Sequence, residues 1–301
     1  MPRLGPRCLS AGSYARYALI LGLREEQRLG VNPFKFGLMA STDTHNAMAG
    51  GVAERGYPGH LGVADDDLAA RATLRPGTYG NGFNNPGGLV GAWAEENTRD
   101  AIFDALVRKE VFGTSGPRIR PRFFGGSGLG PELCDDPDAV AETDATAVPM
   151  GGDLPSPDAA SADAPRFLAL AERDPGGGGA PGGLLQRIQI VKGWVDAEGR
   201  LHERVVDVAG SPDNGAGVEL DTCAPTGPGH DALCTVWTDP DFDPALPAVY
   251  YARVVENPSC RYDEWQCMEA GDAATKEFDE PGGVRTIQGG FGPRHAWLGR
   301  S

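Results

Sequence analysis

The chain has 301 residues, of which 44 are glycine and 25 are proline, and its formal net charge is −15. This charge, with no basic block to offset it, argues against a protein that binds nucleic-acid backbones non-specifically. An apolar fraction of 40% suffices for a folded core, and no uninterrupted apolar run approaches the roughly 18 residues of a membrane span.

A helix is expected first, over residues 13–29, and then a strand over 36–40. The apolar residues that follow helical spacing are Tyr14, Tyr17, Ala18 and Leu21, with Ser10 or Ser13 as the N-terminal cap and Gly30 at the end. The run 36–40 is uniformly apolar, which is typical of a strand buried on both faces of a parallel sheet. We therefore expect residues 41–46 at the carboxyl edge of that sheet, where α/β proteins place their chemistry.

Glycine-rich loops alternate with short elements in the next part of the chain. Residues 47–92 are expected to form a long loop. A second helix is predicted over 98–110, capped by Asn97 or Thr98, with an apolar stripe of Ile102, Phe103, Leu106 and Val107. Short strands are expected at 111–114 and 118–124. Residues 125–182 are rich in glycine, proline, alanine and aspartate, and this composition indicates a linker or a loose domain edge.

The C-terminal part is predicted to be β-rich. Period-two alternation over 185–190, a turn at 196–199 and a return over 201–208 predict a hairpin. Further strands are expected at 217–222, 232–238 and 248–255, and their spacing favours a small β-sandwich. The expected core of this domain, 183–268, consists of Ile188, Ile190, Trp194, Val205 and Trp237. Residues 269–301 show little periodicity, so we expect a poorly ordered tail.

Six cysteines occupy positions 8, 134, 223, 234, 260 and 267. The last four form two close pairs, and we expect disulfides between Cys223 and Cys234 and between Cys260 and Cys267, because no CxxC spacing indicates zinc. Disulfides would place the full-length protein in the periplasm or outside the cell, although residues 1–12 lack the apolar run of a signal peptide. The alternative is a cytosolic protein with four buried free thiols.

Asp43 and His45 are the best candidate metal ligands. On an extended strand end, residues i and i+2 point to the same side, and a carboxylate with an imidazole suits a divalent metal. The alternative is a helix-capping aspartate and a surface histidine. His60, between glycines, and Arg118, after a Gly-Pro turn, are candidate contacts to metal or substrate, and either could equally be a solvated side chain.

The stretch Asp239-Pro240-Asp241-Phe242-Asp243 begins like a calcium-binding loop. It has proline at the sixth position and tyrosine at the twelfth, where an EF-hand needs glycine and glutamate. The EF-hand interpretation therefore fails, and only an irregular calcium site remains open.

Several strings of the sequence resemble a known bacterial family. They are FGLMASTDTHN at 36–46, NPGGL at 85–89, WAEENTR at 93–99, TSGPR at 114–118, RIQIVKGW at 187–194, WTDPDFDP at 237–244 and YYARV at 250–254. Over about residues 10–268, the chain resembles a domain-of-unknown-function family related to the polymerase-and-histidinol-phosphatase (PHP) superfamily of metal-dependent phosphoesterases.

The resemblance implies an α/β fold, in which residues 1–124 form the C-terminal part of a distorted PHP-like barrel and a β-rich, sandwich-like domain follows. Asp43 and His45 match the superfamily's last Asp-x-His ligand pair for zinc, manganese or iron. The earlier His-x-His ligands have no counterpart, since no histidine precedes His45. The chain therefore looks like the C-terminal portion of a longer protein.

The functional expectation is part of a metal-dependent hydrolase that acts on a small, phosphorylated substrate and is incomplete as an isolated chain. The alternative is a non-catalytic binding or structural protein whose β-rich domain is the working part. The sequence does not indicate an oligomeric state.

Overall fold

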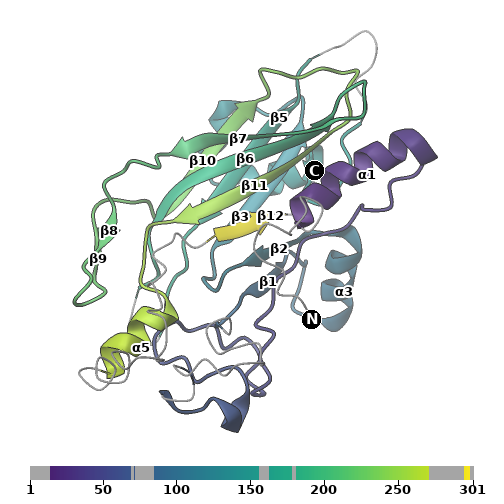
Figure 1. The fold of residues 1–301 in the computed structure, drawn as a ribbon. Helices are drawn as coiled ribbons and strands as arrows, with labels where there is room; N and C mark the ends of the chain where they lie inside the picture. Colours follow the sequence, from purple (N-terminus) through teal and green to yellow (C-terminus); the bar gives the residue numbers. More distant parts are fainter. Residues whose placement is uncertain are drawn as a thin grey trace.

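The computed structural model describes residues 14–68, 71, 85–155, 163–177, 181–270 and 295–298. Two larger antiparallel sheets pack against each other, and helices surround them (Figure 1). In spatial order, the six-stranded sheet contains β1 (Leu89–Ala92), β2 (Val111–Thr114), β12 (His295–Leu298), β11 (Ala248–Glu256), β6 (Leu185–Val195) and β7 (Leu201–Gly210). The four-stranded sheet contains β10 (Ala232–Thr238), β5 (Arg166–Glu172), β3 (Arg120–Gly126) and β4 (Val148–Pro149).

The remaining elements are short. They are the helices α1 (Ala15–Leu29), α3 (Arg99–Arg108), α4 (Ala139–Thr146) and α5 (Tyr262–Ala270), the 3-10 turns η3 (Gly62–Ala64) and η5 (Pro131–Cys134), and the strands β8 (Gly217–Val218) and β9 (Pro225–Thr226). The protein is thus a mixed α/β fold with antiparallel sheets. Within the described residues neither larger sheet closes into a barrel, so the barrel expected from the resemblance is not confirmed.

The main core lies between the two larger sheets. Phe167 of β5 stacks on Phe123 of β3, with ring centroids 5.4 Å apart, and meets Tyr250 of β11 at 4.4 Å. Ile188 and Ile190 of β6 are fully buried in the same cluster, as the sequence predicts. Aromatic rings that interdigitate from two sheets exclude water over a large area, and this burial joins the layers.

The first helix is confirmed, since α1 runs to Leu29 and ends before Gly30. The predicted serine caps lie outside the described residues. α1 packs on the outer face of the six-stranded sheet, against Val191 and Tyr251. Gly193 of β6 permits this close approach, because a Cβ atom there would lie 2.5 Å from Cγ1 of Ile20.

The strand expected over 36–40 is absent, and this part of the prediction is wrong. The segment carries no strand assignment and Met39 is 59% exposed. Its other apolar residues are explained by contacts in two directions. Phe36 and Leu38 pack beside the cluster beneath α1, whereas Gly37 and Ala40 lie close to β2. Uniform apolarity here reflects a crossing segment rather than a strand in a parallel sheet, and every strand pairing described is antiparallel.

The second helix is confirmed as α3, and Thr98 caps it by accepting a hydrogen bond from the amide of Ala101 at 3.3 Å. The predicted apolar stripe, however, faces outward. The four stripe residues are exposed, and Ala105 is the buried residue of this helix.

The loop expected over 47–92 ends earlier, because β1 begins at Leu89. The short strands expected next are β2 and β3.

Residues 125–182 are not a linker, and this expectation is corrected. They supply β5, an inner strand of the four-stranded sheet, in which Phe167, Leu168 and Ala169 are almost completely buried. Because glycine, proline and alanine surround β5, the average composition of residues 125–182 does not indicate its short apolar run. Strands from both sides of this region share a sheet, since β3 precedes it and β10 follows it.

The predicted hairpin is confirmed as β6 and β7, paired in antiparallel register. The strands predicted at 232–238 and 248–255 are β10 and β11, whereas the one predicted at 217–222 shortens to β8. Trp194 and Trp237 are partly buried, and Val205 on the edge strand β7 is 41% exposed, so it is not a core residue. The expectation for the tail falls mostly outside the described residues; His295–Leu298 forms β12.

The predicted disulfide pairing is wrong. Cys134 of η5 bonds with Cys234 of β10, and Cys223 bonds with Cys260. Cysteines close in sequence are held apart because Cys234 is fixed on a strand that faces η5. The bonds therefore join segments 100 and 37 residues apart. Two disulfides fit an extracellular location. None of the described helices is long and apolar enough to cross a membrane.

Among the described cysteines, Cys267 is free and exposed. Partial burial of its thiol raises its pKa above the usual value, so less of the nucleophilic thiolate exists near neutral pH. We expect iodoacetamide to label Cys267 more slowly in the folded protein at pH 8 than after unfolding in urea. Peptide mapping of the labelled, unreduced protein measures this rate. Equal rates in both states would contradict the predicted protection.

Candidate functional site

The candidate metal ligands lie in the loop that leads from residue 41 to η3. Asp43 is exposed and has a left-handed backbone, with φ of 54°. The extended strand end on which the Asp43 and His45 prediction depends is therefore not present. That both residues bind a metal stays a prediction.

The structure brings His45 and His60 together instead. Nδ1 of His45 lies 3.3 Å from Nε2 of His60, and the ring planes are inclined by 51°. The main-chain amide of His45 also donates a hydrogen bond to the carbonyl of His60 at 2.7 Å. Two predicted site residues 15 positions apart therefore form one pair.

Asp65 holds the His60 side of this pair. Its carboxylate is buried and accepts hydrogen bonds from the amides of His60, at 2.7 Å, and Leu61, at 2.6 Å. Gly59 turns the chain with φ of 98°, and a Cβ atom there would lie 2.3 Å from the Asp65 carbonyl oxygen. Asn46 ties the two arms of the loop by donating to the Gly59 carbonyl at 2.7 Å. These contacts position the two imidazoles.

The spacing of the pair fits two ligands of one metal ion. Two imidazole nitrogens, each about 2.0–2.1 Å from a tetrahedral zinc ion, lie roughly 3.3–3.4 Å apart. The same distance fits a hydrogen bond between the rings, in which one nitrogen carries the proton. His45 is exposed and His60 is half-buried, with its Nδ1 atom buried.

A complete metal site needs more groups than this pair. Within the described part of the chain, no group of three or more histidine, cysteine, aspartate or glutamate residues is arranged to hold a metal ion. Asp65 is near, but its two oxygens already accept main-chain hydrogen bonds. Catalytic zinc typically has three protein ligands, so His45 and His60 can supply only part of a coordination sphere.

Arg118 remains a candidate without a demonstrated role. It is exposed, and its main-chain amide donates to Oδ2 of Asp174 at 2.7 Å. This contact fixes the backbone at Arg118, and a contact of its side chain to substrate stays a prediction.

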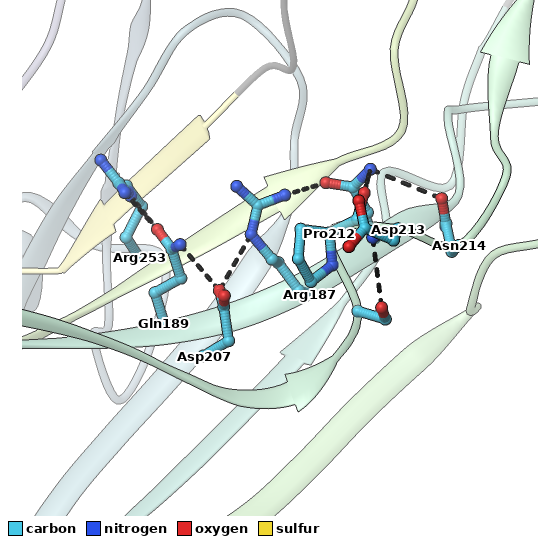
Figure 2. Close-up of polar contacts among 9 residues, drawn as sticks. Arg187, Gln189, Asp207, Pro212, Asp213, Asn214 and Arg253 are labelled. Atoms are coloured by element: carbon cyan, nitrogen blue, oxygen red, sulfur yellow. Dashed lines mark hydrogen bonds and ion pairs between the residues drawn. The ribbon is translucent and has the colours of Figure 1, made fainter.

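A polar network that the sequence does not reveal crosses β7, β6 and β11 (Figure 2). Gln189 is its centre: it accepts from Nε of Arg253 at 2.6 Å and donates to Asp207 at 2.7 Å. Asp207 also pairs with Arg187 at 3.0 Å. Burial lowers the pKa of Arg253. Period-two alternation assigns residues to a face but does not show which positions are adjacent across strands, so the network could not be predicted.

A second buried cluster involves the stretch considered for calcium. Asp239 accepts hydrogen bonds from Nζ of Lys192 at 2.5 Å and from the hydroxyl of Tyr250 at 2.6 Å. Burial, reinforced by the Asp239 carboxylate, raises the pKa of Tyr250. Asp241 forms an ion pair with Arg204. Asp239 and Asp241 thus have cationic partners within the chain, and the buried contacts of Asp239 anchor the stretch to β6 and β11.

Together these features define a disulfide-containing, mixed α/β protein whose antiparallel sheets carry a loop with a histidine pair. The chain belongs to the family described as "Protein of unknown function (DUF3604)", whose profile matches residues 5–288. Nothing in this match connects the chain with the PHP superfamily. Comparison with curated proteins gives no match, and comparison with solved structures gives none.

Proposed function

We propose that this protein provides part of the site of a metal-dependent hydrolase, of the phosphoesterase type. The observation that carries the proposal is the approach of His45 and His60 to 3.3 Å, a spacing compatible with two ligands of one ion. The sequence independently indicates both residues as candidates for this chemistry.

In this proposal His45 and His60 hold a divalent cation, and in the described conformation Asp43 does not join them as a third ligand. Two imidazoles alone leave the coordination sphere of the cation incomplete. A metal ion in such a site polarises a phosphoryl oxygen and lowers the pKa of bound water. The chain's own contribution is to position the imidazoles, which Asp65 does through its hydrogen bonds to the loop amides.

The competing candidate is a non-catalytic binding protein that uses the β-rich part. The network around Gln189 is the most prominent polar feature there (Figure 2). Its donors and acceptors mainly satisfy one another, as in a structural network, so no specific observation favours this candidate over the hydrolase.

Metal binding tests the proposal. We expect weak zinc binding by the chain, and we expect His45→Ala and His60→Ala each to reduce the affinity at least about tenfold, because each variant removes one of few ligands. Isothermal titration with zinc chloride measures the affinity. His230→Ala is the matched control, since His230 is exposed on the β-rich part. Equal zinc affinity in the two loop variants and in the wild type would refute the assignment of the pair.

A further inference from the structure

We propose that Glu54 is a positioning residue of the candidate site: it holds the loop of the histidine pair against the start of α5, and it makes that loop depend on the disulfide that ends at Cys260. This loop, called the histidine loop, comprises residues 41–65. The inference rests on the proposed function, because it concerns how the same two imidazoles are positioned.

Glu54 is a buried carboxylate that contacts a segment 208 positions further along the chain. Its side chain is 2% exposed, and its Oε1 atom pairs with the guanidinium of Arg261 at 2.9 Å. Its Oε2 atom accepts a hydrogen bond from the amide of Tyr262, the first residue of α5, at 2.7 Å. A buried carboxylate is costly unless cations and donors compensate it, and the first amides of a helix lack partners within the helix. These two contacts, called the Glu54 clamp, therefore meet both needs at once.

Two aromatic contacts beside Glu54 join the same segments. The ring of Tyr57 is buried and meets the ring of Tyr262 edge to face, with centroids 5.3 Å apart. The guanidinium of Arg55 lies 5.0 Å from the centroid of the Trp265 ring, as in a cation–π contact. α5 thus lies beside the histidine loop, below the two sheets in the view of Figure 1.

The Glu54 clamp is connected to the groups that position His60. Burial raises the pKa of the Tyr57 hydroxyl, and the nearby carboxylates of Asp65 and Glu54 add to this rise. Tyr57 is therefore close to both carboxylates, of which Asp65 accepts the hydrogen bond from the His60 amide. Two residues after Tyr57, the left-handed turn at Gly59 leads directly into His60. A shift of the clamped part of the loop is thus expected to move His60.

The α5 side of the clamp is fixed by a covalent bond. Cys260 directly precedes Arg261, is buried, and is bonded to Cys223. The Sγ atom of Cys223 also lies 3.4 Å from Sδ of Met268 on α5. The disulfide therefore limits where α5 can begin, and the Glu54 clamp transmits this restraint to the histidine loop.

Hydrogen–deuterium exchange of the metal-free chain tests the clamp. We expect Arg261→Met to speed exchange of the His60 and Leu61 amides at least about tenfold, although this variant leaves the sequence of the histidine loop unchanged. The reason is that the Glu54 carboxylate is then buried without the guanidinium of Arg261, so that local opening is favoured.

A milder variant and a matched control accompany this measurement. Glu54→Gln should speed the same exchange by a smaller factor, because its amide oxygen can still accept from Tyr262 but cannot form the ion pair. Glu203→Gln is the control: Glu203 of β7 pairs with Arg16 of α1 at 3.3 Å, outside the histidine loop. It should leave exchange of the loop amides unchanged.

Isothermal titration with zinc chloride tests whether the clamp acts on the histidine pair. We expect Arg261→Met, and separately the double alanine variant of Cys223 and Cys260, to lower the zinc affinity about tenfold, a usual effect of losing groups that orient metal ligands. Adding Glu54→Gln to the double alanine variant should weaken zinc binding no further, because both changes act through one contact. A role in general stability alone would give additive losses.

The two measurements separate this inference from the proposed function. If the wild type binds no zinc, the metal site is refuted and the exchange rates still decide whether the clamp exists. Unchanged exchange in Arg261→Met and Glu54→Gln, each verified as folded by circular dichroism and thermal melting, overturns the clamp. Faster exchange with unchanged zinc affinity overturns the positioning role, and additive losses overturn the coupling to the disulfide.

Discussion

Replacing Asp239 by alanine is expected to lower the free energy of unfolding by about 3–5 kcal/mol, the usual cost of removing one partner of a buried ion pair. The side chains of Lys192 and Asp239 are 8% and 2% exposed. Without Asp239, the ammonium group of Lys192 would retain the carbonyl of Asp241, at 2.8 Å, as a described partner. The hydroxyl of Tyr250 would lose its acceptor as well.

Urea unfolding followed by circular dichroism measures this change. Asp243→Ala is the matched control, because Asp243 belongs to the same stretch but is exposed and caps a local turn through the amide of Ala245; we expect a loss below about 1 kcal/mol. The double variant Lys192→Met with Asp239→Asn should be more stable than Asp239→Ala, because no unpaired buried charge remains. If Asp239→Ala and Asp243→Ala destabilise the protein equally, the buried pair does not anchor this stretch.

The helices and the hairpin were predictable because local rules determine them. α3 begins where Thr98 supplies a cap and follows an apolar repeat, and β6 and β7 follow a period of two around a short turn. The same rules failed at residues 36–40, because an apolar run has the same composition whether it pairs as a strand or crosses over β2. They also failed at β5, whose apolar core residues are surrounded by glycine and proline.

The candidate site was predictable only in its residue types. The chemistry of His45 and His60 and their flanking residues indicate them as candidates. The contact between the two rings, however, depends on the left-handed turn at Gly59 and on the hydrogen bond that the Asp65 carboxylate accepts. Neither feature produces a repeating pattern in the sequence from which it could be predicted. The disulfides show the same limit, since six cysteines permit 15 pairings and Cys234 is selected for Cys134 by the sheet that carries it.

Loss of the bond between Cys134 and Cys234 is expected to cost about 4–5 kcal/mol of unfolding free energy. In the chain-entropy model, the stabilisation grows with the length of the loop that the disulfide closes, and a loop of about 100 residues corresponds to roughly 4.7 kcal/mol. This bond spans 100 residues, whereas Cys223 and Cys260 are 37 apart. The same model makes removal of the shorter bridge about 0.9 kcal/mol less costly.

The comparison requires two double alanine variants, one for each bridge, unfolded in urea without reductant. Cys267→Ala controls for replacement of a cysteine that forms no disulfide, and it should leave stability nearly unchanged. Cys134 and Cys234 pack against the cluster of Phe124, Leu129 and Leu168, and Cys223 and Cys260 are themselves buried, so loss of contacts adds to the entropic cost of removing either bridge. A larger loss on removal of Cys223 and Cys260 would therefore show that loop length does not control the stability that these bridges provide.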